Sequence, residues 1–212
     1  WLLILGLNEC LVECATVCIK SEIILRTLLV VYHWLFVDLD KIDIYCLHRD
    51  NNDISVSEFI DALDEIKAEG LINKIGASNW KLERFKQARD FALQENKEPF
   101  TILSNNFSLA EMIDPVWPGC VAIDNNFLDY VNQNNIILFP WSSTARGFFI
   151  KKKEIATSDH FSNPSMDEEK RVWHSEANLK RRDICFNIAA ERSVEPIEIA
   201  LAYVIQSSKI IL

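Results

Sequence analysis

The sequence lacks the glycine-rich G-x-G-x-x-G turn that follows a strand in Rossmann domains. That turn lets the backbone approach a pyrophosphate closely, so its absence argues against a Rossmann domain. Arginine-rich and basic-aromatic stretches are also missing, and the formal net charge is −9. This charge disfavours non-specific binding to nucleic acid and to anionic lipid, because both bind basic surfaces. We therefore expect no nucleic-acid partner.

The six cysteines form neither a compact disulfide framework nor a paired metal-binding cluster. Cys10, Cys14 and Cys18 are four residues apart and would share one face of a helix, but no matched second cluster follows them. The other three cysteines are scattered along the chain. We interpret all six as small apolar residues in a reducing compartment. The sequence thus predicts no metal site and a cytoplasmic location.

The apolar N-terminal segment, residues 1–37, has neither a clean membrane span nor the signature of a signal peptide. Charged residues such as Glu9, Lys20 and Arg26 interrupt it, whereas a spanning helix needs about 20 mostly apolar residues. Its start has no basic region and no small-residue cleavage site. We predict a buried helix over Glu22–Phe36, with a membrane segment as the alternative, and we treat residues 1–37 as atypical.

From residue 40 onward, short apolar runs alternate with amphipathic segments. Ser55 and Glu58 have the spacing of a helical capping box, and Gly70 stands where that helix should end. Strand–helix alternation implies parallel strands joined by right-handed crossovers, in a barrel or in a doubly wound sheet. Residues 144–172 look mostly irregular. We predict strands over 42–47, 71–77, 100–103 and 136–140 with another beginning at 209, and helices over about 55–69, 80–95, 124–134, 173–191 and 196–206.

Polar and aromatic side chains follow the predicted strands. In a (β/α)8 barrel the active site forms where the strands end, so four such ends could surround one planar polar ligand. This grouping favours the barrel over the doubly wound sheet. The four stretches are Leu47–Asp50, Gly76–Trp80, Ser104–Phe107 and Trp141–Gly147.

These stretches resemble the aldo-keto reductase family, and most closely its microbial-type branch with S-N-W and W-S-S-x-A-R-G-F. The resemblance covers about residues 38–212 and implies an α/β fold, an incomplete (β/α)8 TIM barrel. It also implies NADP(H)-dependent reduction of aldehydes or ketones to alcohols, with a small-molecule carbonyl substrate. The matching segments are DKIDIYCLHRD (Asp40–Asp50), IGASNW (Ile75–Trp80), FSLAE (Phe107–Glu111), FPWSSTARGFF (Phe139–Phe149) and IEIALAYVIQ (Ile197–Gln206).

The resemblance implies roles for residues in the first half of the barrel portion. His48 matches the active-site histidine, whose N–H can polarise a carbonyl oxygen. Ser78 and Asn79 match the pair that holds the nicotinamide carboxamide, and Ser104 stands where the family usually has a glutamine with the same task. Without the family, His48 would be interpreted as a buried strand-end histidine and Ser78–Asn79 as a helix N-cap.

The resemblance implies cofactor contacts in the second half as well. Trp141 matches the aromatic residue that stacks on the nicotinamide ring. The alternative is that Trp141 packs in the core, which is more common for a lone tryptophan. Ser142, Ser143, Ala145 and Arg146 match the loop beside the pyrophosphate. Hydroxyl, backbone N–H and guanidinium groups bind phosphate well, whereas the alternative is a solvated loop with an ordinary arginine.

Departures from the family pattern leave a second function open. The family's proton-donating tyrosine lies in a D-T-A-x-x-Y-G-like stretch, which this sequence does not contain. A barrel of this type needs about 250 residues, so we expect the opening strands and the closing segment to be missing or altered. The alternative function is a catalytically inactive relative that at most binds nucleotide or a partner. The sequence leaves the substrate, the choice between NADP and NAD, and the oligomeric state undecided.

Overall fold

The computed structural model describes residues 3–7, 10–15, 41–150 and 166–210. The chain divides into two compact units, Trp1–Ser104 and Asn105–Leu212. The predicted helix over Glu22–Phe36 lies outside the described residues, as do Cys18 and Lys20. The proposed boundary between residues 37 and 38 stays a prediction.

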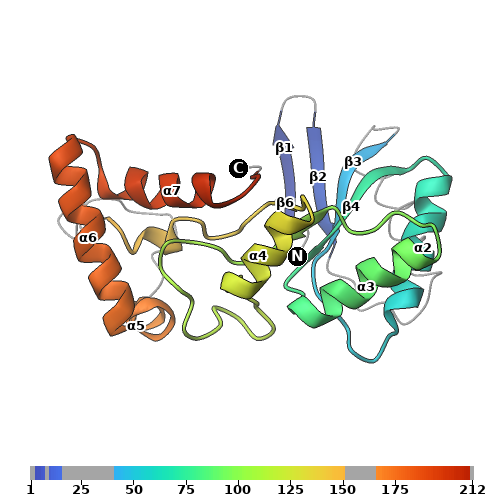
Figure 1. Ribbon diagram of the computed structural model, residues 1–212, viewed down its shortest axis with the longest axis horizontal. Coiled ribbons are helices and arrows are strands. Elements are labelled where there is room, and N and C mark those ends of the chain that lie inside the picture. The colour runs from blue at the N-terminus through green and yellow to red at the C-terminus, as the bar shows by residue number, and fades with distance from the viewer. Residues whose placement is uncertain (1–2, 8–9, 16–40, 151–165, 211–212) are drawn as a thin grey trace. The chain divides into compact units, whose positions relative to one another are not determined.

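A mostly parallel sheet forms the first unit (Figure 1). β1 pairs antiparallel with β2, and β2, β3, β4 and β5 pair in parallel, in that order. Cys10 and Cys14 therefore lie on a strand, and the helix considered for them is wrong. The strands are β1 (Leu3–Leu7), β2 (Cys10–Ala15), β3 (Ile42–Leu47), β4 (Ile72–Ser78) and β5 (Ile102–Ser104).

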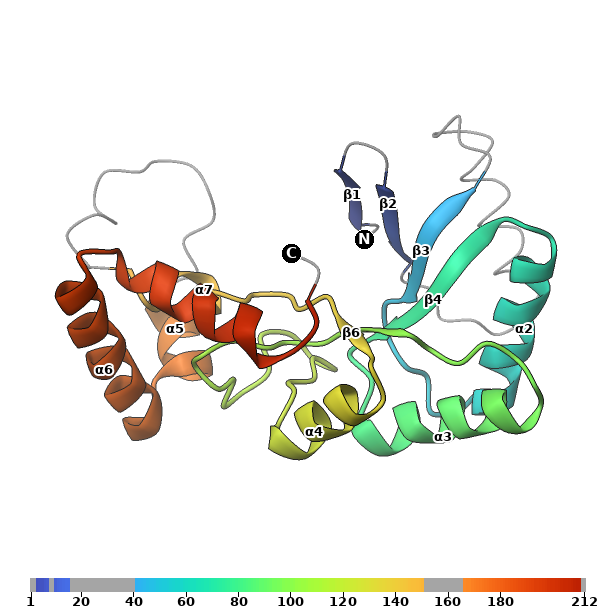
Figure 2. The ribbon, with the colours of Figure 1, turned by 45° about the horizontal axis from the view of Figure 1, so that its top comes forward.

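Two helices join these strands: α2 (Val56–Ala68) links β3 to β4, and α3 (Leu82–Gln94) links β4 to β5 (Figure 2). The predicted capping box is confirmed, because the Ser55 hydroxyl accepts from the Glu58 N–H and the Glu58 carboxylate accepts from the Ser55 N–H. Gly70 ends α2 with φ of +80°, a conformation that favours glycine. α2 contacts both α3 and β4, which confirms the predicted strand–helix–strand order.

Four aromatic rings form the centre of the first unit's core. Trp80 is fully buried and meets Phe59 and Phe100 edge to face, with centroids 5.4 and 5.3 Å apart. Phe100 also stacks on Phe85 at 5.6 Å. Such pairs contribute roughly 0.5–1.5 kcal/mol each beyond their buried area. The tryptophan of the S-N-W motif therefore anchors α3 to the sheet.

Glycine is required at position 76 by the close approach of both neighbouring strands. A Cβ there would lie 2.7 Å from the Cys46 sulfur and 2.8 Å from the Ile102 carbonyl oxygen. Backbone atoms of a central strand cannot move aside without disturbing the hydrogen bonds between the strands. The sheet around Ser78 therefore depends on glycine at position 76.

The second unit is mainly helical (Figure 1). Asp124 and Ser175 cap two of its helices with their side chains, and Leu138 bridges to Ile210 in parallel, which confirms the start of the predicted strand at 209. Its elements are α4 (Asn125–Gln133), β6 (Ile137–Leu138), the 3-10 turn η1 (Ala145–Gly147), α5 (Met166–Trp173), α6 (Glu176–Arg192) and α7 (Pro196–Ser207).

The expectation that residues 144–172 are mostly irregular is wrong over α5. Among its residues whose burial is described, 168–173, Val172 and Trp173 are fully buried, and both lie in the last turn. Two adjacent apolar residues show no helical period, and the helix is held instead by packing on Phe148 and Phe149 in the unit's core.

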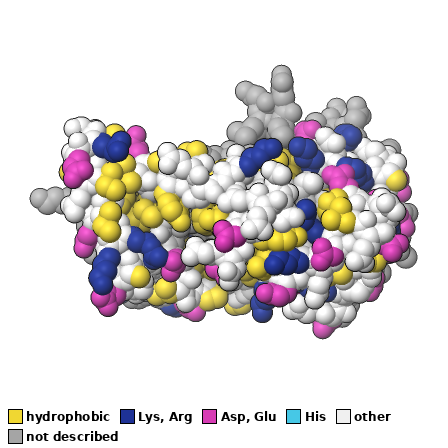
Figure 3. All heavy atoms as spheres, viewed as in Figure 1, with side chains coloured by type: hydrophobic (Ala, Val, Ile, Leu, Met, Phe, Trp, Pro, Cys, Tyr) yellow, Lys and Arg dark blue, Asp and Glu magenta, His cyan; other side chains and the backbone are white. Residues whose placement is uncertain are grey.

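The face drawn in Figure 3 carries Lys and Arg interspersed with Asp and Glu, and hydrophobic side chains gather over α6. Leu179 and Ile184 of that helix are among the exposed large hydrophobic residues. Across the described residues, no helix combines the length and apolar content needed to cross a membrane. Within the same ranges, no three His, Cys, Asp or Glu side chains gather as metal ligands, and the absence of a metal stays a prediction.

We predict that Gly76→Ala lowers the free energy of unfolding by about 2–3 kcal/mol, because the new Cβ overlaps strand backbone. The matched control is Gly70→Ala, where no atom lies within 4 Å and only the positive φ costs about 1 kcal/mol. Urea unfolding followed by circular dichroism measures both. A loss at Gly76 no larger than that at Gly70 would show that the sheet tolerates the side chain.

Candidate functional site

The first unit brings its predicted site residues into one hydrogen-bonded group at the carboxyl ends of three parallel strands. His48 follows β3. Ser78 is the last residue of β4, and Asn79 follows it. Ser104 is the last residue of β5. The Ser78 hydroxyl donates to the Ser104 carbonyl oxygen at 2.6 Å. The Asn79 amide nitrogen donates to the Ser78 hydroxyl at 2.9 Å and to the His48 carbonyl oxygen at 3.4 Å. The predicted grouping of these four residues is therefore present within this unit.

The hydrogen-bond directions limit what this group can offer a ligand. Ser78 has one hydroxyl proton, and the Ser104 carbonyl already accepts it. Ser78 and Asn79 are almost fully buried, with 2% and 6% of their surfaces exposed. The Asn79 amide nitrogen already donates to Ser78 and His48, so a ligand amide would bind mainly by donating to the Asn79 side-chain oxygen, with Ser78 orienting that side chain.

Asn79 has a left-handed backbone, with φ of +58°. Asparagine is among the few residues other than glycine that adopt this conformation at low cost. The backbone turns sharply there, between β4 and α3, so the side chain lies beside the end of β3. The helix-cap interpretation of Ser78 and Asn79 is not needed, because α3 begins later and its N-cap is Lys81.

The loop after His48 is held by an arginine of α3. The Arg84 guanidinium donates to the Asp50 carboxylate at 3.0 Å and to the carbonyl oxygen of Asn51 at 3.1 Å. It also donates to the carbonyl of Ile54 and lies 5.6 Å from the Trp80 ring centroid. Sequence reasoning missed Arg84, although its partner Asp50 lies in the recognised H-R-D stretch.

His48 is half-buried, and its pKa is lowered, first by burial and then by the neighbouring Arg49 cation. Both effects disfavour the imidazolium form. At neutral pH the ring is therefore uncharged and offers one N–H donor and one acceptor nitrogen. A neutral imidazole can polarise a carbonyl oxygen by hydrogen bonding, as the sequence predicted.

The second unit holds the remaining predicted residues on one loop after β6. Trp141 is partly buried and packs against the unit's hydrophobic core, so the core-packing interpretation holds for part of its ring. Its backbone N–H donates to Asn105 and its carbonyl accepts from the Asn106 amide at 3.2 Å. The indole Nε1 is buried and has no hydrogen-bond partner among the described residues. The ring is thus fixed by its backbone and by packing.

The loop that follows has an unusual backbone. Ser142, Ala145 and Arg146 all have φ near +50°, which costs roughly 1 kcal/mol or more per non-glycine residue. Such strain persists where surrounding contacts enforce it and is common at ligand sites. The N–H groups of Ala145 and Gly147 donate to carbonyls within the loop, so they are not available to an anion. The Ser143 hydroxyl donates to the Pro140 carbonyl at 3.1 Å and must rotate to bind a phosphate.

Arg146 is the one cation of this loop. Its Nη1 lies 3.2 Å from the Glu168 carboxylate of α5, and its guanidinium lies 5.1 Å from the Trp117 ring centroid. About a fifth of its side chain remains exposed. The predicted phosphate ligand is therefore partly accessible but already paired with an acid. Sequence reasoning did not single out Glu168 or Trp117.

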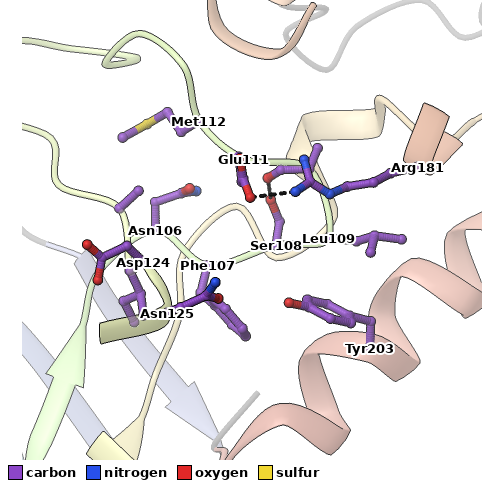
Figure 4. Close-up of a pocket in the computed structure, with 13 residues that line it drawn as sticks. Asn106, Phe107, Ser108, Leu109, Glu111, Met112, Asp124, Asn125, Arg181 and Tyr203 are labelled. Atoms are coloured by element: carbon purple, nitrogen blue, oxygen red, sulfur yellow. Dashed lines mark hydrogen bonds and ion pairs between the residues drawn. The ribbon is translucent and has the colours of Figure 1, made fainter. Parts of the chain in front are cut away.

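A cavity of about 310 Å³ lies within the second unit (Figure 4). Arg181 and Tyr203 reach it from α6 and α7, and Arg181 pairs with Glu111 at 2.5 Å. The Tyr203 ring also packs on Phe107, with centroids 5.8 Å apart. Part of its wall is the F-S-L-A-E stretch, but no sequence pattern linked that stretch to the two helices. None of the predicted site residues lines this cavity.

Comparison with known proteins identifies the family. The family model described as "Aldo/keto reductase family" matches residues 36–212. The chain belongs to the aldo/keto reductase family. A curated aldo-keto reductase of Fusarium vanettenii is 23% identical over 106 residues, which are 50% of this chain and 26% of that relative. The chain thus spans about a quarter of this relative.

Solved structures of the family share the fold of this aldo/keto reductase chain. The glycerol dehydrogenase AKR11B4 of Gluconobacter oxydans has a TM-score of 0.67 at 15% identity, over 99% of this chain and 59% of that one. The thermostable aldo-keto reductase Tm1743, solved with the inhibitor epalrestat, has a TM-score of 0.58 at 19% identity, over 89% and 53%. The predicted α/β fold, an incomplete (β/α)8 barrel, is confirmed.

We predict that protonation of His48 destabilises this chain. The folded-state pKa lies below the ordinary 6.5, so the unfolded chain binds more protons between these two values. Stability should therefore rise with pH through this window and fall as the pH drops below about 6.5. Urea unfolding at pH 7.5 and pH 5.5 measures the effect in the wild type and in His48→Gln, which cannot titrate. Equal pH dependence of the two proteins would show that protonation of His48 does not lower the stability.

Proposed function

We propose that the protein containing this chain is an NADP(H)-dependent oxidoreductase that reduces aldehydes or ketones to alcohols, in the cytoplasm. One observation carries the proposal. The residues that match the family's histidine and carboxamide pair lie together at the ends of adjacent parallel strands, where the Asn79 amide donates to the Ser78 hydroxyl and to the backbone carbonyl of His48. A histidine or an asparagine alone at a strand end would not support it.

Each unit offers groups that suit one part of the nicotinamide cofactor. In the first unit, the side-chain oxygen of Asn79 can accept a hydrogen bond from the nicotinamide amide, while its two N–H groups donate to the Ser78 hydroxyl and the His48 carbonyl. In the second unit, Arg146 supplies a positive charge for phosphate, and the partly buried Trp141 supplies an aromatic surface. Ser104 is too short to take over the full role of the family's glutamine. Each unit thus has groups of suitable chemistry, and the match to the family pattern is weaker at the carboxamide.

The residues of this chain would orient the reactants. A bound nicotinamide supplies hydride to the carbonyl carbon. Asn79 fixes the ring through its amide, with its own side chain held by the Ser78 hydroxyl. His48 donates a hydrogen bond to the carbonyl oxygen, where negative charge develops. Its lowered pKa keeps the imidazole uncharged at neutral pH. Arg84 keeps the loop after His48 in place through Asp50.

Among the described residues, no tyrosine is assigned as donor of the proton that completes the alcohol. Tyr45, which follows the matched D-K-I-D-I stretch, lies inside β3 with 1% of its surface exposed. A neutral His48 is a weak proton source. This shortage supports the alternative function, a catalytically inactive relative that binds nucleotide without turnover.

We predict that Asn79→Ala weakens NADPH binding by roughly 5- to 30-fold, the factor expected for lost hydrogen bonds to a buried amide. Quenching of tryptophan fluorescence measures binding, and NADPH oxidation with a panel of aldehydes measures turnover. Asn96→Ala is the matched control, because Asn96 also has a left-handed backbone, with φ of +56°, but lies on the surface.

The outcomes separate the two functions. Aldehyde-dependent oxidation that falls in Asn79→Ala and in His48→Ala, but not in Asn96→Ala, supports the reductase. Binding without any turnover by the wild-type chain would refute the reductase and leave the nucleotide-binding alternative. Unaltered NADPH affinity in Asn79→Ala would refute the assignment of Asn79 itself.

A further inference from the structure

Arg146 is held from two sides by residues to which the family resemblance gave no role. Glu168 on α5 contacts its Nη1 at 3.2 Å, and Trp117 lies against the guanidinium, with its ring centroid 5.1 Å away. The Glu168 Oε1 atom is excluded from solvent, and both side chains of the pair are about one-quarter exposed. The pair is thus more protected than an ordinary surface ion pair, and screening by salt is weaker.

Among the described residues, the ion pair with Glu168 balances the positive charge of Arg146 before any ligand binds. Arg146 contributes one positive charge and Glu168 one negative charge. Among the described residues, Glu168 is the only acid that forms an ion pair with Arg146. An anion that approaches the loop therefore meets a neutralised guanidinium and a carboxylate that repels it. A phosphate can gain the full attraction of Arg146 only if the carboxylate moves away from Nη1.

We propose that Glu168 occupies, in the absence of ligand, the place at Arg146 that a phosphate oxygen takes when a pyrophosphate-bearing nucleotide binds. Glu168 is then a determinant of affinity, because every bound anion must displace it. Trp117 helps to hold the Arg146 side chain during the exchange, because the guanidinium carbon lies over its ring, 5.1 Å from the centroid. The proposal rests on the proposed function, which makes Arg146 a phosphate ligand.

The strained loop supports an exchange at this position. Arg146 has φ of +52° and ψ of +36° and lies in the one-turn 3-10 segment η1. The N–H groups of Ala145 and Gly147 are used within the loop, so the side chain of Arg146 is the main anion-binding group left there. Removing its competitor should therefore change anion affinity directly.

The test uses inorganic pyrophosphate as the probe, with titration calorimetry on the full 212-residue chain at fixed ionic strength. Glu168→Gln keeps the size and polarity of the side chain and removes its charge. We expect pyrophosphate to bind this variant roughly two- to fivefold more tightly than the wild type. A variant with a merely structural defect would lose affinity and not gain it.

The matched control is Glu169→Gln, which removes the same charge one residue further along α5. Glu169 pairs with His174 at 3.1 Å and not with Arg146, so its affinity for pyrophosphate should stay at the wild-type value. In an Arg146→Met background, Glu168→Gln should give no gain. Unchanged or weaker binding by Glu168→Gln, an equal gain in Glu169→Gln, or no binding by any protein would overturn the proposal. Because the probe carries no nicotinamide, absence of reductase turnover alone would refute the proposed function and leave this result unaffected.

Discussion

The hydroxyl group of Ser78 is the interaction on which the first unit's candidate site depends. It donates to the backbone of β5 and accepts from the Asn79 amide, whose nitrogen in turn reaches the backbone after β3. One buried side chain thus joins the ends of three strands. Buried hydrogen-bond networks that are fully satisfied make a structure more rigid, so this group is set before any ligand arrives.

The close packing of the strands makes this interaction possible. Gly76 allows β3 and β5 to approach β4 two residues before Ser78, and Trp80 anchors the following helix two residues after it. Arg84, on that helix, then fixes the loop beyond His48. In the second unit, by contrast, a strained loop carries Arg146, and the charge of Arg146 is paired with the Glu168 carboxylate. The two units therefore prepare their ligand-binding groups in different ways.

Much of the fold and part of the site could be predicted from sequence, for identifiable reasons. The capping box at Ser55 and the glycine stop at Gly70 are local signals, so α2 was found with its correct ends. α5 was not predicted because Val172 and Trp173, its fully buried residues within 168–173, are adjacent and show no helical period. His48 and Asn79 were found through motifs. Arg84, Glu168 and Trp117 act through contacts between distant segments, which spacing along the chain does not reveal.

The central claim is that the Asn79 carboxamide recognises the amide of a nicotinamide ring. The most direct measurement is a proton–nitrogen correlation spectrum of the labelled chain, with the Asn79 side-chain signals assigned from their loss in Asn79→Asp. We predict that these two signals shift and saturate as NADP⁺ is added. Asn79 side-chain signals that stay unchanged while others in the spectrum shift and saturate would contradict it.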